Sequence, residues 1–118
     1  MLFRSRAAAQ GHAESLQWIR QAAEQGSVEA QASLGDLYIA GEGMARDADE
    51  AAQWVRLAAE QGHTEAQVTL GDLYAAGDGV AQDAGEAVAW YRRAAAQGHG
   101  ASVRRVGQAA RDGWGEER

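Results

Sequence analysis

Glycine pairs precede two segments that the sequence predicts to be helical. Gly41-Glu-Gly43 and Gly77-Asp-Gly79 could hold a phosphate group, because the amino end of a helix attracts anions. A dinucleotide-binding fingerprint also requires a preceding strand and a third glycine. Here a helical pattern precedes each pair, and the third positions hold Arg46 and Gln82. We therefore interpret the glycines as turn residues and predict no cofactor.

Three histidines, His12, His63 and His99, each follow a glycine at a predicted hairpin corner. Zinc requires three or four ligands that converge on one point. Corresponding residues in successive units of a repeat array lie well apart, so these histidines do not converge. The sequence therefore predicts no metal site.

The sequence shows no arrangement for nucleophilic catalysis. It has no cysteine, and no serine lies at a recognisable spacing from a histidine and an acid. The paired carboxylates Asp47 with Glu50 and Asp83 with Glu86 have the spacing of a capping box. In that motif the aspartate accepts from the amide three residues on, and the glutamate reaches back. We expect no enzymatic activity.

The charge is distributed unevenly around a net value of −6. Residues 14–86 are strongly acidic, whereas most arginines lie in residues 1–13 and 87–118. Tryptophans can stack on single-stranded nucleic acid only beside a positively charged groove. The acidic body therefore argues against nucleic acid as a partner, and the charge pattern is that of a solvated surface or of complementary docking.

We expect a soluble chain with no membrane partner. No segment approaches the roughly 20 apolar residues that span a bilayer, and residues 1–10 lack the pattern of a signal peptide. The absence of cysteine leaves two compartments open: the cytoplasm and, if a signal peptide was removed, the periplasm.

A 36-residue period organises the chain, which is the mark of a repeat architecture. The residues that recur at this spacing are Trp18, Trp54 and Trp90, then Gly26, Gly62 and Gly98, then Gly35, Gly71 and Gly107, then Gly41, Gly77 and Gly113. Within each unit, side chains of one type recur at offsets that fall on one face of a helix. The pattern predicts an all-α superhelical solenoid of antiparallel helix hairpins.

Each predicted hairpin has a front helix and a back helix. The front helices are predicted over residues 13–25, 48–61 and 84–97, and the back helices over 28–40, 64–76 and 100–111. The single domain, residues 1–118, divides into a truncated unit or cap (1–12), repeat 1 (13–47), repeat 2 (48–83), and repeat 3 with a C-terminal cap (84–118). The predicted structural core is Trp18, Leu34, Tyr38, Trp54, Leu70, Tyr74 and Trp90, because large apolar side chains on one helix face are usually buried.

Gly35, Gly71 and Gly107 lie inside the predicted back helices. Glycine there costs roughly 1 kcal/mol relative to alanine. We therefore expect each one to permit a close approach between two helices.

The repeated motifs resemble a known family. Ala-x-x-Trp-x-x-x-Ala-Ala-x-Gln-Gly is followed by Ala-Gln-x-x-Leu-Gly-x-Leu-Tyr and by a Gly-x-Gly turn before Asp-x-x-Glu-Ala. This pattern is similar to the Sel-one-like repeat, a relative of the tetratricopeptide repeat, over residues 13–111. The resemblance implies a scaffold or adaptor with a concave groove. Unlike the family pattern, this chain has Ala45 and Ala81 before the acidic caps, where proline is usual.

We expect a protein or peptide to bind the outward side of the front helices. Side chains there differ between units while the packing positions recur, as in an array that varies its binding surface. The predicted binding residues are Gln17, Gln21, Glu24, Gln53, Arg56, Leu57, Glu60, Arg92 and Arg93.

Two alternatives stay open at this stage. Some cysteine-rich relatives imply a β-lactam-binding or β-lactam-hydrolysing enzyme, although this chain lacks their cysteines. The near-identity of the units also fits a structural or engineered array without a native partner.

The amino-terminal unit is incomplete, which bears on self-association. Seven residues separate Gly11 from Trp18, against 28 between Gly62 and Trp90, so 21 residues of a standard unit are absent. A solenoid unit buries its apolar face only against neighbours. We expect either a homodimer whose interface includes Leu2, Phe3 and the face of residues 13–25, or a monomer in which residues 2–10 fold over that face.

Overall fold

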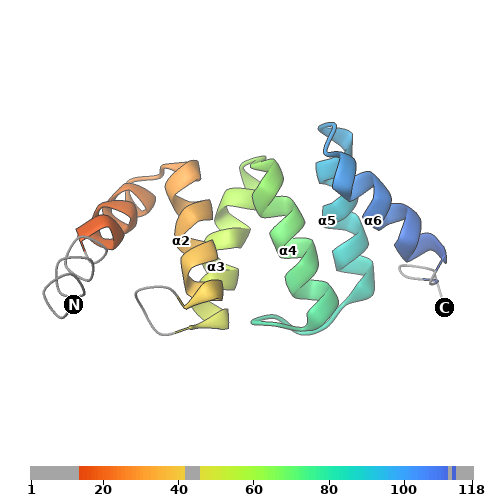
Figure 1. Cartoon of the computed structure of the whole chain (residues 1–118), viewed down its shortest axis with the longest axis horizontal. Coiled ribbons are helices and arrows are strands. Elements are labelled where there is room, and N and C mark those ends of the chain that lie inside the picture. Colours follow the sequence, from red (N-terminus) through yellow and green to blue (C-terminus); the bar gives the residue numbers. More distant parts are fainter. Residues whose placement is uncertain (1–13, 42–45, 112, 114–118) are drawn as a thin grey trace, which may run out of the picture.

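The computed structural model describes residues 14–41, 46–111 and 113. These residues form consecutive helices and no strand. They are a helix over residues 14–24, α2 (Val28–Ala40), α3 (Ala48–Glu60), α4 (Thr64–Ala76), α5 (Ala84–Ala96) and α6 (Gly100–Arg111). Figure 1 shows them side by side along the long axis, each antiparallel to the next. The α/α solenoid is confirmed, and every helix ends within one residue of its predicted bounds.

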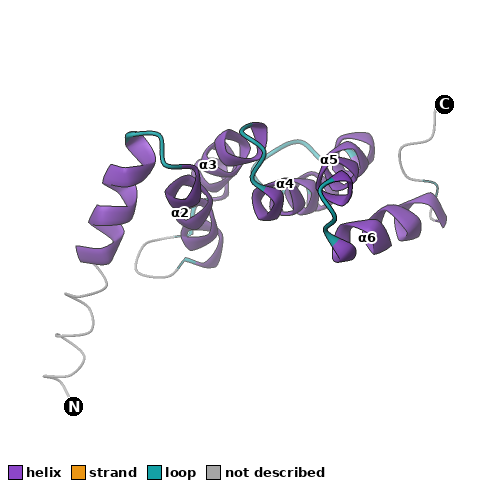
Figure 2. Ribbon diagram, turned by 90° about the horizontal axis from the view of Figure 1, so that it is seen from above, coloured by secondary structure: helices purple, strands orange, loops and turns teal. Residues whose placement is uncertain are grey.

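The front helices are the helix over residues 14–24, α3 and α5, and the back helices are α2, α4 and α6. Seen from above, α3 and α5 lie along one side of the array, and α2 and α4 lie along the other (Figure 2). Gly26, Gly62 and Gly98 follow the front helices with φ between 89° and 102°. This conformation favours glycine and closes a helix, as the sequence predicts.

Each capping box forms only in part. The Oδ1 of Asp47 accepts from the N–H of Glu50 at 3.1 Å, and Asp83 caps α5 in the same way. The N–H of Asp47 donates to the carbonyl of Tyr38 at 3.2 Å, instead of to the glutamate. The reciprocal half of the prediction is therefore wrong. That amide ties the start of a front helix to the end of the preceding back helix.

The glycines inside α2 and α4 permit close helix packing. A Cβ built on Gly35 would lie 2.5 Å from Cγ2 of Val55 in α3, and one on Gly71 would lie 2.5 Å from the ring of Tyr91 in α5. Gly107 of α6 is different, because its Cβ would meet nothing nearer than 3.9 Å. The prediction of close approach is confirmed at the first two glycines and wrong at Gly107, since no described helix packs on that face of α6.

The predicted core is confirmed except at one residue. Leu34 and Leu70 are fully buried, and the other confirmed residues are Tyr38 and Trp90, which are buried, and Trp54 and Tyr74, which are partly buried. Trp18 is 71% exposed, so its assignment to the core is wrong. Trp54 and Trp90 pack in clusters with the back helix that precedes them. Trp18 has no such helix before it among the described residues.

Some predictions fall on residues outside the described part of the chain. These are the cap over residues 1–12, which includes His12, the predicted interface residues Leu2 and Phe3, and Gly43 and Ala45, which precede α3.

We expect Gly35→Ala to lower the free energy of unfolding by about 1 kcal/mol. The overpacking of Val55 costs roughly 1–3 kcal/mol and outweighs a gain in helix propensity of about 1 kcal/mol. Gly107→Ala is the matched control, because it keeps the propensity gain and adds no clash, so it should be stabilising. Denaturant unfolding followed by circular dichroism measures both. Shifts of the same sign would contradict close packing at Gly35.

Candidate interaction surface

The predicted binding residues lie on the front helices. We call them the front-helix face: Gln17, Gln21, Glu24, Gln53, Arg56, Leu57, Glu60, Arg92 and Arg93. All are exposed except Arg56, which is partly buried. On α3 the other side of the helix carries Ala51, Val55 and Ala58, which are at most 1% exposed. Burial of the small apolar side therefore turns the polar side outward.

Most residues of the front-helix face line one of two depressions. The first lies along the amino-terminal helix and is lined by Glu14, Gln17, Trp18, Arg20, Gln21 and Glu24. The second lies between α3 and the turn before α5, and is lined by Asp49, Ala52, Gln53, Arg56, Leu57, Gly79 and Val80. Both are open to solvent and suit an extended segment or a helix rather than an enclosed small molecule.

Two arginines of this surface are fixed by tyrosines of the following back helix. Arg20 donates to the hydroxyl of Tyr38 at 2.5 Å and lies 5.7 Å from the ring centre. This hydrogen bond raises the pKa of Arg20. Arg56 donates to Tyr74 in the same way, with its guanidinium 5.6 Å from the ring. Arg56 therefore bridges α3 and α4 as well as lining the second depression.

The third unit lacks this bridge because position 110 is alanine in the sequence. Arg92, which corresponds to Arg20 and Arg56, makes no hydrogen bond or ion pair with the described residues. Its neighbour Arg93 lies over the ring of Trp90, with its guanidinium 4.4 Å from the ring centre. Arg93 thus places a cationic side chain on α5 at the repeat position where the earlier units have Gln21 and Leu57, which are uncharged.

Apolar groups also reach the solvent in both depressions. Trp18 is 71% exposed and Leu57 is 45% exposed, and each lines one depression. An apolar anchor surrounded by polar side chains is the usual anatomy of a binding hot spot. Within the described residues no three His, Asp or Glu side chains gather as metal ligands.

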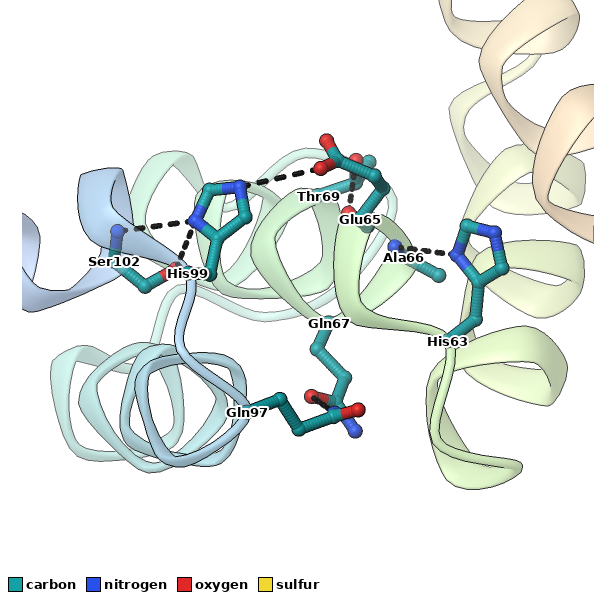
Figure 3. Close-up of polar contacts among 8 residues, drawn as sticks. All are labelled: His63, Glu65, Ala66, Gln67, Thr69, Gln97, His99 and Ser102. Atoms are coloured by element: carbon teal, nitrogen blue, oxygen red, sulfur yellow. Dashed lines mark hydrogen bonds and ion pairs between the residues drawn. The ribbon is translucent and has the colours of Figure 1, made fainter.

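The sequence interpretation missed a polar network that links successive units at their corners. His63 caps α4 by accepting the N–H of Ala66 at 3.1 Å, and its other ring nitrogen lies 3.3 Å from Glu29. Figure 3 shows the next unit, where Nδ1 of His99 accepts from Ser102 and Nε2 lies 3.2 Å from Glu65. His63 and His99 therefore act as helix caps, a role usually taken by Ser, Thr, Asp or Asn.

A glutamine ladder accompanies the histidines. Gln97 donates to the side chain of Gln67 at 2.8 Å (Figure 3), and Gln67 in turn donates to the carbonyl of Ala59 at 3.1 Å. Gln61 and Gln31 repeat the arrangement one unit earlier at 2.7 Å. The 36-residue recurrence of these glutamines was the available signal. Because both buried glutamines are only 5% exposed, their hydrogen bonds serve packing and not recognition.

Three adjoining segments of the chain, residues 10–27, 28–63 and 64–99, match the family model of the Sel1 repeat. The chain belongs to the Sel1 repeat family. Members of this family are generally protein-interaction modules and are typically not enzymes. The Sel1 unit runs from a back helix to the next front helix, so it is out of phase with the front-then-back hairpins of the sequence analysis.

Solved structures of Sel1 repeat proteins from bacteria are similar to this chain. The protective antigen c5321 of uropathogenic Escherichia coli, with an SLR fold, is 42% identical with a TM-score of 0.86, over 90% of this chain and 23% of its own. A Sel1 repeat protein from Oxalobacter formigenes is 39% identical with a TM-score of 0.82, and the match covers 86% of this chain and 42% of that protein. Helicobacter pylori cysteine rich protein B is 27% identical with a TM-score of 0.71, and the match covers 75% of this chain and 66% of that protein.

This chain therefore spans less than half the length of the first two of these proteins. No curated protein sequence matches it. None of the helices in the described part of the chain has the length and hydrophobicity needed to cross a bilayer.

The different environments of the tryptophans predict different contributions to stability. We expect Trp18→Ala to change the free energy of unfolding by no more than about 0.5 kcal/mol, as for an exposed side chain. Trp90→Ala should cost about 3–5 kcal/mol, because Trp90 is only 6% exposed. Denaturant unfolding at low protein concentration compares the two variants. Equal losses would show that Trp18 is packed after all.

Proposed function

We propose that this Sel1 repeat chain is a protein-interaction module that binds a polypeptide through the front-helix face. The observation that carries the proposal is the second depression. There Leu57, an apolar side chain that is 45% exposed, lies among polar groups of α3. An apolar side chain in a depression lined by polar groups has the arrangement of a binding anchor.

The variation along the array supports the same face. Positions 21, 57 and 93 are Gln, Leu and Arg, whereas Ala23 and Ala59, on the packed side of the same helices, do not vary and are buried. The arginines fixed by tyrosines add a preorganised cation to each depression, and a fixed cation binds with less loss of side-chain entropy.

The chemistry of the second depression suggests the kind of segment that would bind. Leu57 offers an apolar contact, and Arg56 and Asp49 offer one charge of each sign. An apolar side chain flanked by charged or amide groups fits this lining. Nucleic acid fits poorly, because residues 14–86 are strongly acidic and phosphate contacts dominate nucleic-acid binding.

The hydrolytic alternative gains no support from the relatives. The Helicobacter protein is named for its cysteines, and this chain has none. If the chain were a structural array without a partner, substitution of the exposed Leu57 would change no binding affinity.

We expect Leu57→Asp to weaken polypeptide binding by about 2 kcal/mol, which is roughly thirtyfold in Kd, as for the loss of an interface anchor. Peptides are first selected from a random display library on the immobilised wild-type chain. Their affinities are then measured by fluorescence polarisation against wild type and variants.

Val103→Asp is the matched control. Val103 is a similarly exposed apolar residue, at 56%, but it lies on α6, away from the front-helix face. Wild-type affinity in the control and loss in Leu57→Asp would support the face. Selected peptides that bind Leu57→Asp as tightly as wild type would remove this surface from consideration.

A further inference from the structure

Within the chain, each front helix packs against the back helix before it in one fixed way. The helices α2 and α3 are antiparallel, and Gln61 at the end of α3 donates to Gln31 near the start of α2 at 2.7 Å. The start of α3 lies beside the end of α2, where Asp47 donates to the carbonyl of Tyr38. Between these ends, Gly35 of α2 allows Val55 of α3 to approach. This contact is a template for any further front helix that joins a back helix.

The helix over residues 14–24 has the same side open. Ala51 and Ala58 of α3, which face α2, are 0% exposed. The corresponding residues of the first helix are Ser15, which is exposed, and Ala22, which is partly buried. Trp18, at 71% exposed, lies on this side as well. The helix over residues 14–24 therefore exposes the side that, in α3, packs on the preceding back helix.

The last described helix, α6, exposes the side on which, in α2, the next front helix packs. Val103, Arg104 and Gly107 of α6 stand where α2 has Gln31, Ala32 and Gly35. Gln31 and Ala32 are buried, whereas Val103 is 56% exposed and Arg104 is exposed. A shallow depression covers this side of α6, and its lining is Ala101, Val103, Arg104, Arg105, Gly107, Gln108 and Arg111.

The helix α6 is firmly held from its other side. Tyr91 of α5 donates to Oδ1 of Asp72 at 2.5 Å, and Nε of Arg105 lies 3.5 Å from the same oxygen. Burial and the bond to Asp72 raise the pKa of Tyr91, which favours the protonated hydroxyl that donates to Asp72. The open side of α6 is thus presented on a fixed helix.

The two open sides carry opposite net charges. The first depression holds Glu14 and Glu24 against Arg20, whereas the depression on α6 holds Arg104, Arg105 and Arg111 and no acid. By the 36-residue period, Arg111 corresponds to Ile39 at the end of α2, and Glu14 corresponds to Glu50 at the start of α3. The template brings those two ends together, so it would bring Arg111 of one molecule beside Glu14 of another.

We propose that this chain associates head to tail with a second copy of itself, the Trp18 side of the first helix packing on the open side of α6. The occupant is a second copy because the open side of α6 holds the repeat position on which a front helix packs, and because Glu14 and Arg111 carry opposite charges. The two proposals share the first depression, but self-association does not involve Leu57 or the second depression. It uses the predicted face of residues 13–25 and joins it to a different surface, the open side of α6, on the second copy.

A contact between two different surfaces does not close after one step. It produces chains or rings whose size grows with concentration, whereas a two-fold interface stops at a dimer. The ion pairs lie at the rim, so salt weakens the association.

Sedimentation velocity of the full 118-residue chain, over a wide concentration range and at low and high salt, tests the proposal. We expect Trp18→Ala to weaken association roughly thirtyfold or more, as for a tryptophan hot spot. Arg111→Glu should weaken it about tenfold, because an attraction becomes a repulsion. Arg92→Glu makes the same charge change on α5, outside the contact, and should associate like wild type.

Two further samples separate the head-to-tail contact from a symmetric one. The double variant Glu14→Arg with Arg111→Glu should associate again, because each reversed charge meets the other on the next copy. A mixture of Trp18→Ala and Arg111→Glu should form one-to-one pairs, since each variant keeps one intact side. Circular dichroism melting checks that every variant is folded.

A wild-type chain that stays monomeric throughout the range would overturn the proposal, as when another part of the chain covers the first helix. A dimer that Trp18→Ala abolishes but Arg111→Glu leaves intact would also overturn it, in favour of a symmetric interface. Leu57→Asp should associate normally, so a failure of the proposed polypeptide binding leaves this result unaffected.

Discussion

The contact between a back helix and the next front helix is the constraint on which the rest of the structure depends. At Gly35 and Gly71 the next front helix packs so closely that even a methyl group would overlap the side chain of Val55 or Tyr91. Glycine inside a helix is unfavourable by itself, so close packing of small side chains must compensate. The buried Gln31 and Gln67 add hydrogen bonds that align the helices along their length.

This packing decides what the surface can do. Small apolar residues are buried between helices. His63, His99 and the paired glutamines make contacts between successive units. The outward side of the front helices then carries the variable residues, including Leu57 and the tyrosine-bound Arg56. The same contact also explains the ends of the described array, where Trp18 and Gly107 have the form of packing residues without the neighbour that packing requires.

The fold could be predicted from the sequence because a 36-residue recurrence constrains every unit in the same way. The prediction failed for Trp18 and Gly107, because the period gives the residue type while burial depends on a neighbouring helix. The roles of His63 and Gln67 were also missed, since capping by histidine and side-chain ladders depend on geometry that spacing does not reveal. Variation between units predicts the binding face, because positions that vary while the packing residues recur are free of packing constraints.

Hydrogen exchange of the backbone amides tests most directly the claim that each helix is stabilised by neighbours on both sides. Local opening is least favourable where a helix is packed on two sides. In the monomer, exchange should be slowest in α3, α4 and α5, and fastest in the helix over residues 14–24 and in α6. Uniform protection along the array, or the strongest protection in the first helix or α6, would contradict the account.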